Sequence, residues 1–287
     1  MGCTRNGLAL ESVAVFCYHN APMETLSLRQ QTILNRVVEL YIETAQPVGS
    51  RAITVLFRDL YADSYSPATV RYEMGQLESV GYLTHPHISA GRVPTDKGYR
   101  FYLDHGLKGE TVSQEVFGEV GREISNAARE EQILGETIST ILAALTSQMS
   151  VVAISDSAPS LLTSALIRLY LKGTHRLLEY PEFHDVRKVR GLLSHIDETT
   201  AFARWLDERC MESPGISVTI GNENKLSVFQ DCTVISASCR MSNRRRAMLA
   251  LIGPRRMRYA RTIPLINRLR ETIEQALERV LRSPVDA

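Results

Sequence analysis

The sequence lacks any hydrophobic run that reaches the roughly 18 apolar residues a membrane-spanning helix needs. Cysteine is also scarce, and none of the five residues lies in the CxxC spacing of a zinc site or a redox motif. A scattered, odd set of cysteines argues against a disulfide framework and indicates a reducing compartment, so we expect a cytoplasmic protein without membrane contact. The five are Cys3, Cys17, Cys210, Cys232 and Cys239.

Net charge is nearly absent, since 33 basic and 32 acidic residues leave a formal charge of +1. Nucleic-acid binders often carry a strong basic excess, so any such signal here must be local. The hydrophobic fraction of 44% and the charged fraction of 23% are typical of a globular protein. A length of 287 residues allows two modest domains and a connector.

Catalytic motifs are missing as well. Of the seven histidines, His85 and His87 lie in one short segment, whereas His175, His184 and His195 are dispersed. The sequence contains no nucleophile motif, HExxH pattern or P-loop. We therefore expect a protein that is not an enzyme and that needs no cofactor and no metal.

The first 25 residues differ in character from the rest of the chain. The stretch "LALESVAVFCYHNA" is mildly apolar, but Glu11 interrupts it and no small-residue cleavage site comes after it. We expect residues 1–25 to form a flexible extension, with Met23 as an alternative start to Met1. A cryptic export signal is the competing interpretation.

Two helices are predicted next. Ser27 and Gln30 form a capping-box signature before the helical spacing of "SLRQQTILNRVVELYIET". Pro47 and Gly49 break this helix. "SRAITVLF" then predicts a short second helix with Ser50 as its cap, followed by a polar turn around residues 62–64.

A third helix begins at Ser66-Pro67, because serine suits the cap and proline suits the first helical position. Gly81 ends it as a left-handed cap. The apolar side chains that share one face are expected in the core, and they are Val70, Met74, Leu77 and Val80.

The next segment predicts a β-hairpin. "YLTHPHI" and "RVPTD" form two short strands around the small loop Ser89–Arg92, and "TDKGYRFYLDHGL" restarts a helix. Three helices followed by a hairpin is the order of a winged helix-turn-helix domain, which we assign to residues 26–105. The hairpin from Thr84 to Pro94 is then the wing.

The outward face of the third helix carries the side chains that suit DNA. Arg71 offers a guanidinium fork that matches guanine in the major groove, and Ala68 or Thr69 suits the thymine methyl group. Arg92 supplies a cation at the wing, while Arg29 and Arg51 add weaker phosphate candidates. The competing interpretation of Arg71 is an ordinary solvated side chain. The predicted DNA-binding residues are Ser66, Pro67, Ala68, Thr69, Arg71, Tyr72, Gln76 and Arg92.

The remainder of the chain predicts an α+β fold. Residues 106–148 follow a helical pattern and are expected to form a connector, although several glycines weaken that pattern. "MSVVAIS" predicts a buried strand, "ALIRLYLKGTHRLLEYPEF" an apolar segment with a turn, and "DVRKVRGLLSHIDETTAFARWLDERC" two helices. Three strands, "ISVTIG", "CTVISAS" and "AMLALIG", precede a terminal helix from about Pro264 to Leu281.

A basic stretch near the end admits two interpretations. No acidic residue lies between its first and last arginine. It forms either a solvated face or an auxiliary surface for phosphate or an acidic partner. Its members are Arg240, Arg244, Arg245, Arg246, Arg255, Arg256, Arg258 and Arg261.

Several strings together resemble HrcA, the heat-inducible transcription repressor family of bacteria. They are "RQQTILNRVVELYIETAQPVGSRAI", "SPATVRYEMGQLESVGYLTHPHISAGRVPTDKGYRFYLD", "LLEYPEFHDVRKVRGLL", "DCTVISASCR" and "IGPRRMRYARTIPLI". The match covers nearly all of residues 26–105 and most of residues 173–281. The string "SAGRVPTDKGYR" is the most specific of them.

The resemblance implies a negative regulator of chaperone operons that binds an inverted-repeat operator on double-stranded DNA as a homodimer and is released on heat stress. It also implies a winged-helix domain, a GAF-like domain with an inserted dimerising segment, and the chaperonin GroEL as a partner. Tyr72 stands where the family leads us to expect a small polar residue, which puts the details of base reading in doubt.

The middle of the chain departs further from the family. We expect a shortened GAF-like domain in residues 149–287, with a truncated insertion at about 156–210. The connector at 106–148 and the terminal helix then carry more of the dimer contact. This shortening motivates an alternative function, a ligand-sensing or protein-binding module that has lost DNA binding.

Overall fold

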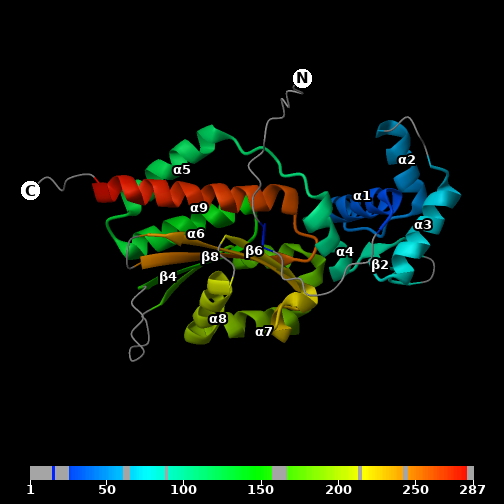
Figure 1. Cartoon of the computed structure of the whole chain (residues 1–287). Helices are drawn as coiled ribbons and strands as arrows, with labels where there is room; N and C mark the ends of the chain where they lie inside the picture. Colours follow the sequence, from blue (N-terminus) through cyan, green and yellow to red (C-terminus); the bar gives the residue numbers. More distant parts are fainter. Residues whose placement is uncertain are drawn as a thin grey trace, which may run out of the picture.

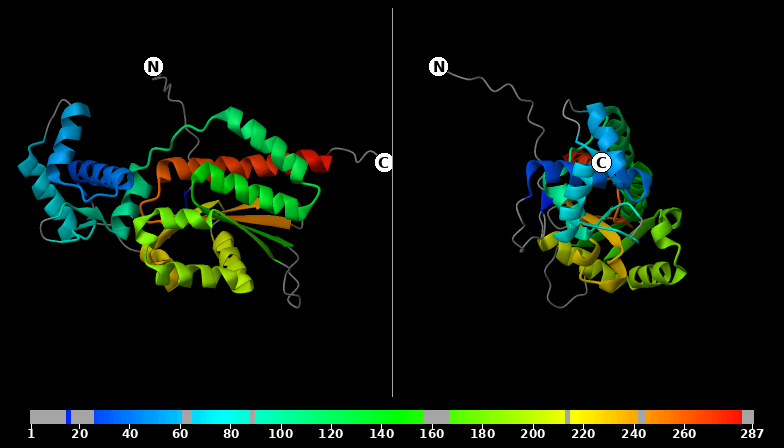
Figure 2. Two further views of the ribbon diagram at one scale, coloured as in Figure 1. Left: turned by 180° about the vertical axis from the view of Figure 1, so that it is seen from behind. Right: turned by 90° about the vertical axis from the view of Figure 1, so that its right-hand side faces the viewer.

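The computed structural model describes residues 15–16, 26–60, 65–87, 90–156, 167–212, 215–241 and 245–282. We call residues 26–106 the helical unit, and residues 108–282 together with Val15–Phe16 the sheet unit. Figures 1 and 2 show the helical unit at one end of the sheet unit, with α4 at the junction. The turn expected at residues 62–64 lies outside the described residues.

The first two helices form where the sequence places them. In α1 (Leu28–Thr44), Gln30 N donates to Ser27 Oγ and Ser27 N donates to Gln30 Oε1, so the predicted capping box is confirmed. α1 ends at Ala45, which adopts a left-handed conformation. The expected cap at Ser50 is wrong, because Ser50 is the first residue of α2 (Ser50–Leu60). The carbonyl of Gly49 instead accepts the first helical bonds, from Ala52 and Ile53.

The third helix, α3 (Pro67–Ser79), has Ser66 as its N-cap and Pro67 in its first turn, as predicted. Its end is a Schellman motif: Tyr82 N donates to Leu77 O, Gly81 N donates to Glu78 O, and Gly81 has a φ of 80°. Glycine is favoured here because a side chain strains this backbone conformation.

The predicted hairpin is present as β2 (Leu83–Thr84) antiparallel to β3 (Val93–Pro94). Thr95 then caps α4 (Asp96–Phe101), which continues as a π-helical turn over Tyr102–Gly106. The side chains that fill the centre of the helical unit include Ile33, Val37, Val70, Leu77 and Tyr82, all fully buried.

A six-stranded sheet forms the middle of the sheet unit, in the order β1-β6-β7-β8-β4-β5. Its strands are β1 (Val15–Phe16), β4 (Met149–Asp156), β5 (Arg168–Lys172), β6 (Ile216–Ile220), β7 (Cys232–Arg240) and β8 (Arg245–Pro254). Only the pair β1–β6 is parallel. The sequence predicts β4, β6, β7 and β8 but neither edge strand, and β1 lies within the segment expected to be a flexible extension. The rest of that segment lies outside the described residues.

Helices cover both faces of the sheet (Figure 1). One layer holds α5 (Gln114–Ala127), α6 (Glu131–Thr146) and α9 (Tyr259–Arg282), and the other holds α7 (Val186–Asp197) and α8 (Thr199–Glu212). Alternate residues of β4 serve the two layers: Val152 and Ile154 pack toward the first, and Val151 and Ala153 toward the second. Residues expected to act as a connector therefore pack as part of this layered unit.

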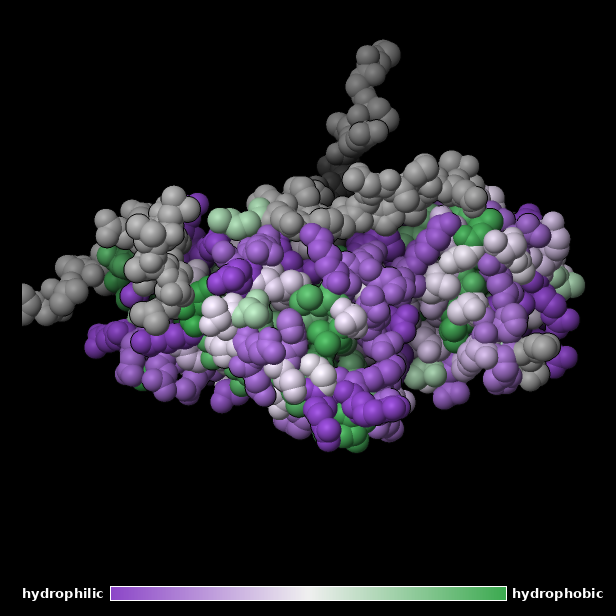
Figure 3. Space-filling view, turned by 90° about the horizontal axis from the view of Figure 1, so that it is seen from below, coloured by the Kyte–Doolittle hydropathy of each residue, from purple (hydrophilic) through white to green (hydrophobic). Residues whose placement is uncertain are grey.

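The face that carries α7 and α8 is seen in Figure 3. Hydrophilic residues dominate it, and hydrophobic residues appear in small, separate groups. Exposed apolar side chains on these helices include Val186 and Met211. Scattered exposure of this kind is ordinary for a protein surface and marks no broad apolar patch on this face.

The last helix begins earlier than predicted, at Tyr259 rather than at Pro264. Proline inside a helix lacks the N–H that would bond to the carbonyl four residues before it. Here that carbonyl, on Ala260, accepts a hydrogen bond from Glu110 N at 2.8 Å. The backbone that follows the helical unit thus takes the place of the missing donor, and the helix continues through Pro264.

Candidate nucleic-acid interface

The helix α3 has a buried face and an exposed face. Val70, Met74 and Leu77 are buried as predicted, and Val80 is half-buried against the core. The opposite side presents Arg71, Tyr72 and Gln76 to solvent, with Tyr72 65% exposed. Figure 1 shows α3 at the end of the molecule away from the sheet, so the sheet unit does not cover this face.

The start of α3 holds four more of the predicted residues. Ser66, Pro67 and Ala68 are exposed, and Thr69 is half-buried. The Ser66 hydroxyl accepts a hydrogen bond from Thr69 N at 3.1 Å and lies 2.9 Å from the Thr69 hydroxyl. Ser66 therefore holds the helix end, and small side chains leave its positive dipole end accessible.

The predicted cation of the hairpin, Arg92, lies apart from these residues in an ion pair. Its Nε donates to Glu78 Oε2 at 2.7 Å, and Glu78 also bonds to His85. Burial alone would raise the pKa of Glu78, but the hydrogen bond from His85 and the charge of Arg92 together lower that pKa below its ordinary value. The guanidinium of Arg92 thus fixes the hairpin to α3 and is only partly exposed.

The backbone of the hairpin also contacts the segment between α1 and α2. Val48 N donates to Arg92 O and Arg92 N donates to Val48 O, each at 2.8 Å. A β-carbon on Gly91 would lie 2.6 Å from the Val48 backbone, so this close approach requires glycine. Packing inside the helical unit therefore explains why this loop contains a glycine. Ser89 lies outside the described residues.

The two weaker phosphate candidates differ in their surroundings. Arg29 forms an ion pair with Glu73 at 3.3 Å and lies over the Tyr65 ring at 5.1 Å, whereas Arg51 is exposed on α2. Glu73 is buried on the inner face of α3 and was not identified from the sequence. Its partner lies 44 positions away, so no local pattern could have indicated the pair.

Much of the basic stretch is occupied by internal ion pairs. Arg245 pairs with Glu131, Arg246 with Asp207, Arg255 with Asp96 and Asp231, and Arg256 with Glu182. Arg240, Arg258 and Arg261 are exposed, and Arg244 lies outside the described residues. Most of the described arginines in this stretch therefore form ion pairs within the protein and do not make up one basic surface.

The described cysteines carry no reactive site. Cys210, Cys232 and Cys239 are buried and unbridged, and burial raises the pKa of Cys210 and of Cys232 to about 12. Within the described ranges, no cluster of histidine, cysteine, aspartate or glutamate has the arrangement of a metal site. No helix in the same ranges is long and apolar enough to cross a membrane.

Comparison with known proteins identifies relatives of the chain. Residues 98–263 match the family described as "HrcA protein C terminal domain". The "Heat-inducible transcription repressor HrcA" of Shouchella clausii is 28% identical over 342 aligned positions, which cover 88% of this chain and 98% of that protein. The protein of the same name from Geobacter sulfurreducens is 28% identical over 345 positions, covering 89% and 99%.

These alignments are longer than the 287 residues of the chain, so the relatives carry residues that have no counterpart here. A solved structure titled "Crystal structure of a hypothetical protein at 2.2 A resolution" shares the fold, with a TM-score of 0.65 and 18% identity over 89% of this chain and all of that one. Because the matched region spans more than half of the sequence, the chain belongs to the HrcA family.

Proposed function

We propose that this chain is a transcription repressor whose helical unit is a winged helix-turn-helix domain, with α3 as the recognition helix and the β2–β3 hairpin as the wing. The protein acts as a homodimer on an inverted-repeat operator in double-stranded DNA. In helix-turn-helix dimers, two recognition helices read half-sites one helical turn apart, or a multiple of it. The names of the curated relatives support the repressor activity.

The observation that carries the proposal is the outward face of α3. Arg71, Tyr72 and Gln76 project from it, and among the described residues the structure gives none of these side chains a hydrogen-bond partner. Arginine pairs with guanine and glutamine with adenine through two hydrogen bonds in the major groove. A surface that offers both groups on one short, uncovered helix suits direct reading of base pairs.

The other predicted residues take supporting roles. Ser66, Pro67, Ala68 and Thr69 place the N-terminal end of α3, where backbone N–H groups favour a phosphate. Arg92 serves the wing indirectly, because its pair with Glu78 sets the position of the hairpin on α3. Exchange of Glu78 for a DNA phosphate would bring Arg92 into direct contact.

For the sheet unit we propose a shortened GAF-like domain with a reduced dimerising insertion between β4 and β6. The aligned lengths of the relatives support a deletion in this chain. In the described part of this interval, β5 extends the sheet and α7 and α8 cover it. The dimer contact is then expected to involve α5, α6 and α9, the helices of the opposite layer (Figure 1).

The experiment that tests DNA reading is selection of duplexes from a random library, followed by affinity measurements on the selected site and a scrambled site. We expect Arg71→Ala to reduce discrimination between the two by about 1–3 kcal/mol. The matched control is Arg122→Ala, because Arg122 is an exposed arginine on α5 and lies outside the helical unit. Equal discrimination by the parent and Arg71→Ala would remove α3 as the reading surface.

Release on heat stress and action through the chaperonin GroEL are proposed from the family relationship. A reporter gene placed behind the selected operator tests both. Repression is expected to weaken on a temperature upshift and to strengthen when GroEL is supplied in excess. Unchanged repression in both arms would leave a DNA-binding repressor without this regulation.

A further inference from the structure

A small cavity lies between the helical unit and the sheet unit, well apart from the exposed face of α3. Its volume is about 200 Å³, smaller than the roughly 300–1,000 Å³ of pockets for drug-sized ligands. Ile42 and Glu43 at the end of α1 form one wall, and residues of the sheet unit form the others. An occupant would therefore contact both units.

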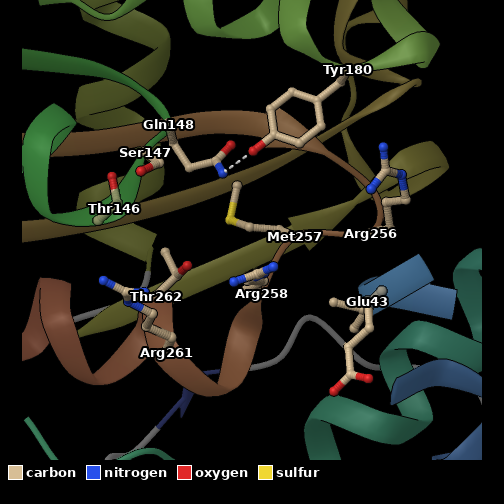
Figure 4. A pocket seen from close by; sticks show the side chains of 11 residues that line it. Glu43, Thr146, Ser147, Gln148, Tyr180, Arg256, Met257, Arg258, Arg261 and Thr262 are labelled. Carbon is tan, nitrogen blue, oxygen red and sulfur yellow. Dashed lines mark hydrogen bonds between the residues drawn. The ribbon is translucent and has the colours of Figure 1, made fainter. Parts of the chain in front are cut away.

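The charged groups around the cavity are mainly basic. Arg256, Arg258 and Arg261 line it, whereas Glu43 is the one acidic residue in the lining (Figure 4). Arg256 is neutralised by Glu182, with a bond of 2.5 Å from its Nε. Arg258 and Arg261 are exposed, and in the described part of the chain neither side chain has a carboxylate or other hydrogen-bond partner. Two guanidinium groups are thus left for a ligand.

The backbone near these arginines adds to the positive potential. Arg258 directly precedes α9, and Arg261 lies in its first turn. The helix dipole places a partial positive charge at this end, and the helix has 24 residues. The C-terminal end of α6 also lines the cavity, through Thr146 and Ser147, and carries the partial negative charge of its helix dipole. An anionic group is therefore favoured on the α9 side.

The remaining lining supplies polar groups that can position a ligand. Gln148 donates from Nε2 to the Tyr180 hydroxyl at 2.8 Å, as Figure 4 shows. Gln148 is only 5% exposed, and its Oε1 has no hydrogen-bond partner. That oxygen packs beside Gly253 and can only accept a hydrogen bond, so it does not bind an anion. The Tyr180 hydroxyl, which accepts the bond from Gln148, keeps its own O–H proton and can donate it to an anionic oxygen.

From this arrangement we infer that the cavity between α1, Tyr180 and the start of α9 binds a small oxyanion with two or more negative charges, held by Arg258 and Arg261. The class comprises phosphorylated and polycarboxylate metabolites of a few to about a dozen non-hydrogen atoms, in keeping with the size of the cavity. Guanidinium groups suit both, because they form paired hydrogen bonds with phosphate and carboxylate oxygens.

Calorimetric titration of the full chain without DNA tests the inference, with pyrophosphate, inorganic phosphate and citrate in separate arms at fixed ionic strength. We expect saturable binding of at least one probe, and at least about tenfold weaker binding by Arg258→Ala/Arg261→Ala, since each charge-assisted bond contributes substantially. Preference for pyrophosphate or for citrate distinguishes a phosphorylated ligand from a polycarboxylate.

The matched control is Arg190→Ala/Arg279→Ala, which removes two exposed arginines from α7 and from the far end of α9. It should bind the probe as the parent does, and so should Arg71→Ala, whose position is on α3. All these positions are exposed, so none of the variants should unfold, and Arg261→Glu gives a second test by charge reversal. Absence of saturable binding, or equal binding by the Arg258/Arg261 variant, would overturn the site. Either result leaves the proposed DNA reading untouched, because operator affinity is measured separately.

Discussion

Arg100 in α4 and Glu223 in the segment after β6 join the two units of the molecule. Arg100 Nε donates to Glu223 Oε1 at 2.8 Å, and Arg100 Nη2 donates to the carbonyl of Val218 at 2.6 Å. The Arg100 side chain is 1% exposed. A guanidinium this deeply buried requires its carboxylate, because an unpaired charge in the interior is costly.

The first prediction concerns this pair. Glu223→Ala should lower the free energy of unfolding by about 3 kcal/mol, because it removes the nearer carboxylate from the buried charge of Arg100 and leaves it with the more distant one of Asp104, 3.7 Å away. Urea unfolding measures the loss. Glu208→Ala provides the comparison, since Glu208 is an exposed residue of α8, and it should change stability by less than about 0.5 kcal/mol. Similar losses for the two variants would show that the junction does not depend on the pair.

The second prediction uses the carboxylate of Glu78. Its pKa is lower in the folded protein than the ordinary value of 4.5, so the ionised form stabilises the fold above that value. This stabilisation disappears as the pH falls through the lower, folded pKa. Glu78→Gln should therefore cost about 0.5–1 kcal/mol at pH ~7 and less at pH ~3, relative to the parent.

Urea unfolding at the two pH values checks this prediction, with Glu119→Gln as the control on an exposed position of α5. The control should show no dependence on pH of this kind. A Glu78→Gln effect of the same size at both pH values would mean that the charge of Glu78 does not hold Arg92 and His85.

The local signals in the sequence were sufficient for most of the helical unit. Ser27 with Gln30, Ser66 with Pro67, and Gly81 act through bonds to residues a few positions away, so their effect is visible in a short window. The division of α3 into a buried and an exposed face followed from helical spacing in the same way.

Features that depend on distant residues were not predicted. β5 has the burial pattern of an edge strand, with only Tyr170 buried, and pairing with β4 defines it. The early start of α9 depends on the bond from Glu110 to Ala260. At the candidate interface, Arg92 forms an ion pair with Glu78, which lies 14 positions away. No local pattern in the sequence indicates this pair.

The third prediction concerns the described thiols. Burial raises the pKa of Cys210 and Cys232 to about 12, and raises that of Cys239 as well, so almost no reactive thiolate is present near neutral pH. In the variant Cys3→Ser/Cys17→Ser, Ellman's reagent at pH ~8 should label none of these thiols until denaturant is added. Rapid labelling of the native protein would contradict the burial of these residues on the two faces of the sheet.

The fourth prediction compares two glycines in helices. A β-carbon on Gly135 of α6 would lie 2.2 Å from the Tyr170 ring, whereas one on Gly118 of α5 would meet nothing within 4 Å. Alanine favours a helix over glycine by about 1 kcal/mol, so Gly118→Ala should stabilise the protein by up to that amount. Gly135→Ala gains the same propensity but forces the Tyr170 ring to move, and overpacking typically costs about 1–3 kcal/mol.

The measurement is thermal or urea unfolding of both variants, and the sign of the change decides the matter. We expect Gly118→Ala above the parent and Gly135→Ala below it. The double variant Gly135→Ala/Tyr170→Ala should destabilise by less than the sum of its single changes, because the clash is gone once the ring is removed. Additive effects would show that Gly135 is not needed to make room for the Tyr170 ring. They would also show that α6 and β5 pack in another way.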